Sequence, residues 1–268
     1  MTPSAVGELR ALWQARRLLW AFTWNDLKGR YVGSSIGFFW TVLVPVLELA
    51  TYTFVFHVLI GVKFHPSQGT SQYVLFLFCG MVAWNAFADG LTRATTSIRD
   101  HGHLLRKLNF PAVVLPAHVV LSAVVNQVFR LMILMLGMLL IGDGVSWHVL
   151  VVPFVVAVQA CLTLGVGLLF ATLNVYFRDM SHWVSAGLML GMFMTPVFYP
   201  ASEYPRAFVM LLYPNPMAQI IGMYQGLMLN QHMPFVNAML WATITPAMAL
   251  FAGASAFAYA RRRFADLV

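Results

Sequence analysis

Long apolar stretches are the feature that most constrains what this chain can fold into. Hydrophobic residues make up 60% of its 268 residues, and only 9% are charged. An average soluble domain carries about 25% charged residues, and a helix needs about 20 mostly apolar residues to cross a bilayer. A water-soluble fold of this size could not bury so much apolar surface. The composition therefore predicts an all-α integral membrane protein.

Six apolar segments are predicted to be transmembrane helices. They occupy roughly residues 38–61, 73–91, 111–141, 147–175, 183–199 and 235–259. Residues 200–233 are also apolar, but prolines interrupt them, and helical pieces such as 217–229 are too short to span. Irregular backbone persists at membrane depth only where protein or a water-filled cavity surrounds it. This segment is predicted to be a re-entrant outer hairpin that acts as a gate; the alternative is an outer cap with no role in transport.

The first 30 residues are predicted to form an amphipathic helix that lies in the membrane interface. Leu9, Leu12, Trp13, Leu19 and Trp20 recur at helical spacing, with arginines at other positions. The alternative is a soluble helix packed on a partner. We therefore divide the chain into an interface helix, residues 1–30, and a transmembrane domain, residues 31–268.

The basic residues predict the orientation. Of 16 Lys and Arg residues, only Lys63 and Arg206 fall at the ends opposite the N-terminus, and Arg130 lies within the third segment. Because cytoplasmic ends carry the excess of Lys and Arg, both termini are predicted to be cytoplasmic. The net charge of +7 is then explained by the membrane and not by nucleic acid.

The sequence contains none of the motifs that would give this chain chemistry of its own. It has no GxxxxGK[ST] phosphate loop, no HExxH and no GxSxG. Cys79 and Cys161 lie in apolar stretches, and the spacing of His101 and His103 does not indicate a metal site. We expect no catalytic residues, no metal and no cofactor on this chain.

Three charged residues lie within predicted spans, namely Glu48, Asp89 and Arg130. Such residues usually face a cavity or a partner. Counted from the outer ends, the depths of Glu48 and Arg130 differ by only ~3 Å, but counted from the inner ends they differ by ~12 Å. They could therefore form a pair or line a channel. Asp89 is near the inner end and could be interfacial.

Residues 93–110 mix apolar and basic residues between two spans. They could form a short helix that docks into a partner's groove, or a solvated loop held by anionic lipid.

Four short motifs, in this order, resemble type-2 ABC exporter permeases, especially those that export lipid-linked O-antigen, capsule or teichoic acid polysaccharides. They are NDLKGRY with GSSIGFFW at 25–40, LLRKLNFP at 104–111, NVYFRD at 174–179, and TPVFYP at 195–200 with NPM at 215–217. The chain departs from the family pattern at Asn25, where a basic residue is expected.

The resemblance implies a homodimer that works with two copies of a separate ATPase subunit, which would bind ATP and Mg. It also implies a lipid-linked polysaccharide as substrate. ATPase coupling would fall to His103, Leu104, Leu105, Arg106, Lys107, Asn109, Arg178 and Asp179. The outer gate would involve Tyr199, Pro200, Tyr204, Tyr213, Asn215, Pro216 and Met217.

Basic residues at the predicted inner interface suggest a site for the anionic carrier headgroup. The candidates are Arg16, Arg17, Lys28 and Arg30, for which ordinary anchoring to the membrane is the alternative. Two other functions stay open, namely a permease for a small drug or lipid and a membrane enzyme that acts on lipid-linked sugars. The chain has no large outer domain, which favours polysaccharide over drug. It also lacks paired acidic or His residues at a membrane face, which disfavours the enzyme.

Overall fold

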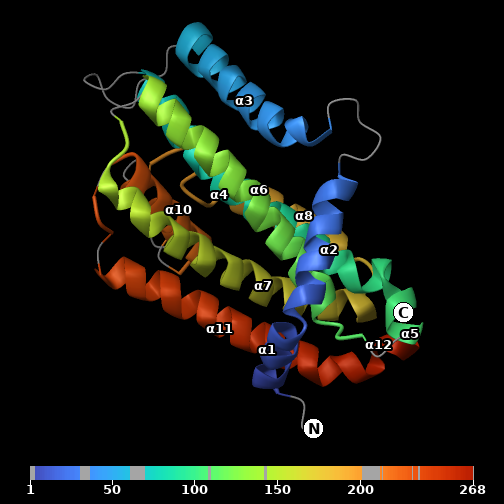
Figure 1. Ribbon diagram of the computed structural model, residues 1–268. Coiled ribbons are helices and arrows are strands. Elements are labelled where there is room, and N and C mark those ends of the chain that lie inside the picture. Colours follow the sequence, from blue (N-terminus) through green and yellow to red (C-terminus); the bar gives the residue numbers. More distant parts are fainter. Residues whose placement is uncertain are drawn as a thin grey trace.

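The computed structural model describes residues 4–30, 37–60, 70–107, 110–141, 144–200, 212, 214–230, 232–234 and 236–267. All regular structure in these ranges is helical, which confirms the all-α prediction. Long helices lie side by side in a bundle, and short helices gather at the end that carries both termini (Figure 1). We call this the terminal end.

Four helices are long and apolar enough to cross a membrane. They are α4 (Thr70–Asp100), α6 (Val114–Ile141), α7 (Val152–Tyr176, preceded by the 3-10 turn Trp147–Val151) and α11 (Val236–Ala260). They coincide with the second, third, fourth and sixth predicted spans.

The other two predicted spans contain shorter α-helices. The first holds α3 (Trp40–Tyr52), which continues as a π-helix over Thr53–Ile60, and the fifth holds α8 (Met180–Phe193). Pro45 lies inside α3, where it cannot donate a backbone hydrogen bond. Pro196 disfavours helical backbone at the residue before it, and α8 ends before the predicted boundary at 199. Helices α3 and α8 have only 13 and 14 residues, so the structure does not confirm that they cross the membrane. The number of six spans therefore stays a prediction.

The segment after the second predicted span is mostly helical and is not a solvated loop. Helix α4 continues past the predicted end at 91 to Asp100, and α5 (Gly102–Lys107) follows after one residue. The extension is stable because Ala94, Thr95 and Ile98 are fully buried, and because the hydroxyl of Thr95 donates to its own helix. Helical propensity and burial therefore outweigh the polar composition that suggested a loop.

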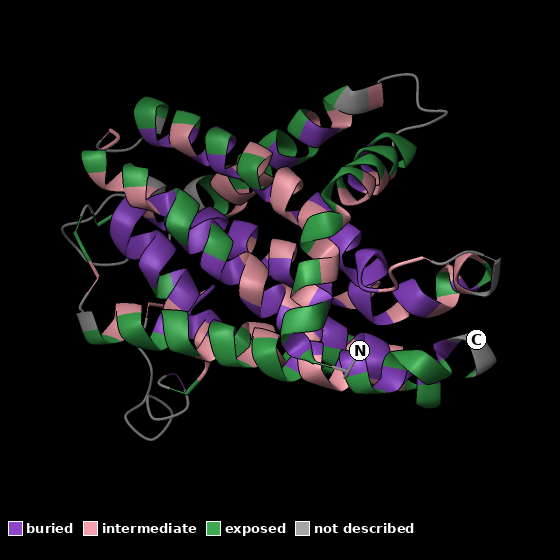
Figure 2. Cartoon of the chain, turned by 60° about the horizontal axis from the view of Figure 1, so that its bottom comes forward, coloured by how far each residue is buried: buried purple, intermediate pink, exposed green. Residues whose placement is uncertain are grey.

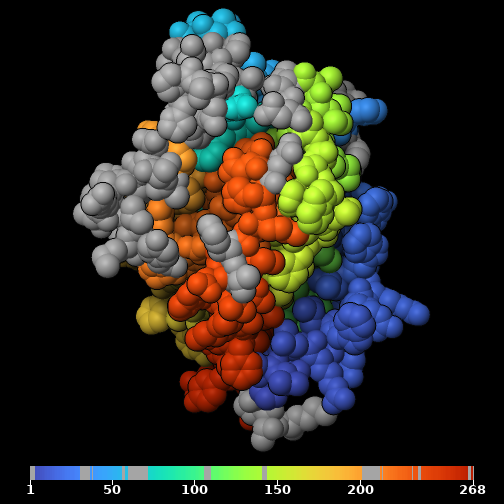
Figure 3. Space-filling view, turned by 90° about the vertical axis from the view of Figure 1, so that its left-hand side faces the viewer, coloured from blue at the N-terminus to red at the C-terminus, as the bar shows by residue number. Residues whose placement is uncertain are grey.

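The N-terminal segment forms two helices, α1 (Ala5–Gln14) and α2 (Arg16–Gly29), which break at Ala15. Helix α1 packs on α11 and α2 packs on α6. Buried residues on one side of each helix contrast with outward-facing tryptophans, of which Trp13 is 71% exposed. Each helix therefore has a buried side and an exposed side that carries tryptophans. That the two helices lie in the membrane interface stays a prediction. Figure 3 shows the N-terminal helices beside the terminal end of α11.

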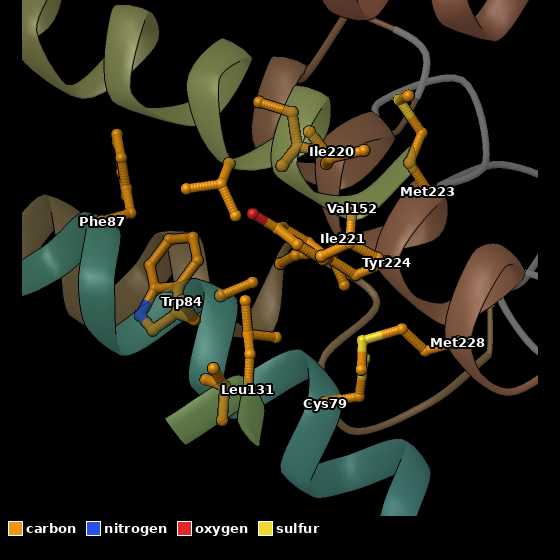
Figure 4. Packing of buried hydrophobic residues seen from close by; sticks show 14 of the residues in the cluster. Cys79, Trp84, Phe87, Leu131, Val152, Ile220, Ile221, Met223, Tyr224 and Met228 are labelled. Atoms are coloured by element: carbon orange, nitrogen blue, oxygen red, sulfur yellow. The ribbon is translucent and has the colours of Figure 1, made fainter. Parts of the chain in front are cut away.

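The core lies between the long helices and a buried helix, α10 (Pro216–Met228). Figure 4 shows Tyr224 of α10 packed among apolar side chains such as Ile220, Trp84 and Cys79. Pro216 opens α10, and the side chain of Asn215 caps it by accepting from the backbone N of Met217 at 3.0 Å. The buried residues follow the inward faces of the helices (Figure 2). Large apolar side chains remain exposed on α3, α8 and α11.

Two glycines allow α7 and α11 to approach each other closely. A Cβ at Gly165 of α7 would clash with the backbone of Leu250, and a Cβ at Gly253 would clash with the backbone oxygen of Gly165. Small residues allow membrane helices to approach closely, so this pair fixes α7 against α11.

Candidate functional site

Four charged side chains join α2 to α4. Arg30 donates to Asp89 at 2.8 Å, and Arg93 donates to Asp26 and lies 3.8 Å from Asp89. Arg30 also lies 3.6 Å from Asp26. The hydroxyl of Ser122 donates to Asp26 at 2.5 Å and so links α6 to the group. We call Asp26, Arg30, Asp89 and Arg93 the four-charge cluster, in which two acids balance two bases.

The environment of Asp26 favours its charged form. Burial opposes the carboxylate, but hydrogen bonds from Ser122 and Arg93 and the charges of Arg93 and Arg30 outweigh it. The pKa of Asp26 is therefore lower than usual.

The sequence prediction assigned no role to Asp26 or Arg93. A signal was present, because Asp26 and Arg30, and likewise Asp89 and Arg93, are four residues apart, a spacing at which helical side chains meet. What the spacing could not reveal is that these two helical pairs face each other.

The predicted headgroup residues do not form one site. Arg16 and Lys28 are separated by ~18 Å along α2, since each helical residue rises 1.5 Å. Arg16 and Arg17 are exposed, and Arg16 lies over the ring of Trp13. Lys28 is exposed over the ring of Trp24, 5.3 Å from its centroid. Arg30 alone is held by carboxylates, so its charge is already neutralised.

A cavity of about 250 Å³ lies among α3, α4 and α6. Arg130 on its wall donates to Glu48 at 2.6 Å, and Asp89 on its wall accepts from Arg30. Arg130 thus pairs with Glu48 and also lines this cavity, and whether it lines a transport channel stays a prediction. The lining residues are Arg30, Trp40, Thr41, Val44, Pro45, Asn85, Ala86, Asp89, Ala123, Asn126, Gln127 and Arg130.

A buried polar network supports one wall of this cavity. The amide nitrogen of Gln127 donates to the side-chain oxygen of Gln159 at 2.9 Å and to the hydroxyl of Tyr224 at 3.0 Å. Gln159 in turn donates to the backbone oxygen of Ala83 at 2.8 Å. These bonds link α6, α7, α10 and α4. Hydrogen bonds between helices contribute to packing in membranes, where the lipid offers no polar partner.

The predicted coupling residues lie at the terminal end. In α5, His103 is exposed, whereas Leu104 and Leu105 are half-buried and pack against a cluster that includes Phe257 and Phe264. Arg178 and Asp179 are exposed at the start of α8. Arg106 and Lys107 belong to α5, and Asn109 lies outside the described residues.

A groove of about 360 Å³ connects Arg178 with the end of α4. Arg99 and Asp100 of α4, Asn174 of α7 and Leu267 of α12 (Phe264–Leu267) line it with Arg178. The structure thus places the two segments predicted for coupling at one end of the bundle.

The predicted outer-gate residues are only partly described. Tyr199 is 61% exposed and Pro200 is half-buried. Asn215 and Pro216 form the start of α10, and Met217 is buried behind them. Tyr204 and Tyr213 lie outside the described residues. Across the part of the chain that the structure covers, no group of three His, Cys, Asp or Glu side chains could hold a metal ion.

Comparison with known proteins points to one kind of protein. The sequence profile of the family described as ABC-2 type transporter matches residues 17–231. The O-antigen export system permease protein RfbA of Myxococcus xanthus is 35% identical over 265 residues, which cover 97% of this chain and 98% of that protein. Two Klebsiella pneumoniae proteins of the same name are 28% identical over 253 residues, which cover 94% of this chain and 95% of theirs.

Proposed function

Because this chain belongs to the ABC-2 type transporter family, we propose that it is the membrane subunit of an ATP-driven exporter that moves lipid-linked O-antigen polysaccharide across the bacterial inner membrane. The chain is a transporter permease subunit and not an enzyme. The observation that carries the substrate is the near full-length similarity to three permeases named for O-antigen export. Capsular polysaccharide and teichoic acid are the alternative substrates within this class.

The family makes this chain a multi-pass membrane protein, and the four long helices agree with that. We propose six spans with both termini in the cytoplasm. Helix α3 with its π-helical continuation and α8 would supply the first and fifth spans. The burial of α10 among other helices supports a re-entrant outer hairpin, because backbone that enters the membrane without crossing it must be covered by protein.

The proposed protein partners rest on membership of the family and on the exposed apolar surface of the chain. An ABC permease requires an ATPase, and we propose two ATPase copies, carrying ATP and Mg, bound to a homodimer of this chain. Helix α5 and the Arg178–Asp179 turn would contact the ATPase at the terminal end. The exposed apolar faces of α3, α8 and α11 support a second copy or lipid as their neighbours.

The roles proposed for individual residues change in one respect. Arg16, Arg17 and Lys28 are exposed at the proposed cytoplasmic interface, where they would attract an anionic carrier headgroup. Arg30 is the weaker candidate, because Asp89 and Asp26 already neutralise it. Tyr199 and Pro200 would form part of the outer gate.

Co-purification with the candidate ATPase, followed by reconstitution into liposomes, tests the proposal. We expect a stable complex whose ATP hydrolysis rises with lipid-linked O-antigen and stays at its basal rate with the lipid carrier lacking glycan. A complex that responds to small hydrophobic drugs instead, and not to the glycan, would contradict the proposal. A chain that hydrolyses lipid-linked sugar on its own would also contradict it.

A further inference from the structure

Helix α5 is too short to keep its shape or its place without support. It has 6 residues, whereas an isolated helix in water needs about 12–15 residues to be even marginally stable. Its side chains Leu104 and Leu105 are half-buried and pack against an apolar cluster, and His103 is exposed. The position of α5 therefore depends on the elements that carry this cluster.

The main neighbour of α5 is the C-terminal helix α12. Among the helices of the described ranges, α12 is the one that α5 packs against most extensively, and the two lie together at the terminal end (Figure 1). The structure describes two α12 side chains, of which Phe264 is 1% exposed and Leu267 is 49% exposed. Phe264 belongs to the apolar cluster on which Leu104 and Leu105 pack. The last residues of the chain thus support a helix that lies far away in the sequence.

Contacts with two other helices hold α12 in turn. The ring of Phe264 meets the ring of Phe257 of α11 edge to face, with centroids 5.1 Å apart. Arg261, in the 3-10 turn Arg261–Arg263 just before α12, pairs with the carboxylate of Glu8 of α1 at 2.7 Å. Helix α5 therefore packs on an element that is fixed to α11 and linked to α1.

We propose that α12 holds α5 in the orientation in which it contacts the ATPase, with Phe264 as the positioning residue. This inference rests on the proposed role of α5 as an ATPase contact. Leu267 of α12 lines the groove that also includes Arg178, so α12 reaches both segments proposed to meet the ATPase. A firmly held α5 passes a displacement on to the bundle, whereas a loose α5 moves alone. Without the ring of Phe264, ATP hydrolysis therefore drives little export.

Truncation of the Phe264 side chain tests this support. Phe264→Ala removes the ring, and Phe264→Leu keeps an apolar side chain that fills much of the same space. Phe78→Ala is the matched control, because Phe78 is also fully buried but lies ~33 Å along α4 from Asp100. Thermal melting shows whether each variant is folded, and Phe264→Val with Phe78→Val replaces the alanine pair if either alanine variant unfolds.

The first measurement is amide hydrogen exchange of residues 101–107 in the purified full-length chain, which needs no ATPase. We expect exchange at least about tenfold faster in Phe264→Ala than in the wild type, because fewer apolar contacts oppose local opening. Exchange in Phe78→Ala and Phe264→Leu should stay close to that of the wild type. The second measurement is glycan exported per ATP hydrolysed by the complex in liposomes, which Phe264→Ala should lose and Phe264→Leu should restore.

Three outcomes overturn the proposal. Unchanged exchange in the folded Phe264→Ala variant would show that α12 does not hold α5. Equally fast exchange in Phe78→Ala would show that any core truncation loosens α5. Normal export per ATP in a variant whose α5 exchanges faster would show that the support has no part in coupling. A wild-type complex whose ATP hydrolysis ignores lipid-linked O-antigen, with α5 exchange that depends on Phe264, would refute the proposed export function and leave the support of α5 by α12 standing.

Discussion

Replacement of Asp26 and Arg93 measures how strongly the four-charge cluster fastens α2 to α4. The Asp26 and Arg93 side chains are 17% and 29% exposed, and their hydrogen bond is charge-assisted. Such bonds contribute about 1.5–3 kcal/mol when buried, and partial exposure lowers this toward the value of surface pairs, below about 1 kcal/mol. We therefore expect a coupling energy of about 1–2 kcal/mol between Asp26→Asn and Arg93→Gln.

The assay is a double-mutant cycle on the purified chain, with unfolding in SDS followed by circular dichroism. Asp26→Asn alone should destabilise by about 2 kcal/mol, because Arg93 and Ser122 lose an ionised acceptor. The control Arg17→Gln lies on the exposed side of α2 and should change stability by less than about 0.5 kcal/mol. Additive effects of the two cluster variants, within about 0.3 kcal/mol, would show that the cluster does not act as a unit.

The pH dependence of this contribution has a definite sign. The pKa of Asp26 is lower in the folded protein than in the unfolded chain, so the folded state favours the carboxylate. The stabilisation is fully present above the ordinary pKa of Asp, 3.8, and is lost as the pH falls through the lower folded value. The stability difference between wild type and Asp26→Asn should therefore be constant from about pH 5 to 8 and shrink below about pH 4.

Three further predictions concern other helices. Burial raises the pKa of Glu8 despite its 2.7 Å pair with Arg261. Glu8→Gln should therefore be more stable than wild type at pH 7–8, and this difference in stability should vanish as the pH falls below 4.5. Thermal melts across this pH range measure the difference, and the opposite trend would show that burial does not dominate. Gly165→Leu should destabilise by at least about 1–3 kcal/mol in the SDS assay, since its side chain would meet the backbone of α11, and unchanged stability would refute the close contact. Leu104→Ala with Leu105→Ala should abolish export while ATP hydrolysis continues, as measured in liposomes, and normal export would rule out α5 as the coupling element.

The sequence alone was sufficient to predict the four long helices. Runs of apolar residues identified α4, α6, α7 and α11, because a bilayer demands a length that few other structures need. Four short motifs in the right order identified the family, which the comparisons confirm. Local pattern failed where packing decided the outcome. The sequence placed the end of the second span near Leu91, yet burial of Ala94 and Ile98 keeps α4 helical to Asp100.

The four-charge cluster and the cavity were harder to predict from the sequence, because they depend on which helices are neighbours. Glu48 and Arg130 could be suspected of pairing from their depths, and they do pair. The involvement of Arg30 with Asp89 could not be foreseen, since the two residues are far apart in the chain and only the packing of α2 near α4 brings them together. The cavity likewise depends on how α3 packs against α4 and α6, which no spacing encodes.

Helix α4 is a single continuous helix. It contains 31 residues, so its length is ~46 Å, and it has no internal proline and no break in its helical assignment. One end leads into α5, and the wall of the cavity, with Asn85 and Asp89, lies along its length. A continuous helix without a kink moves as one body, so a displacement of one end also displaces the rest of the helix. A tilt of ~5° would move its far end by ~4 Å, so displacement at the terminal end would be felt at the cavity wall and at the guanidinium groups of the four-charge cluster in the same motion.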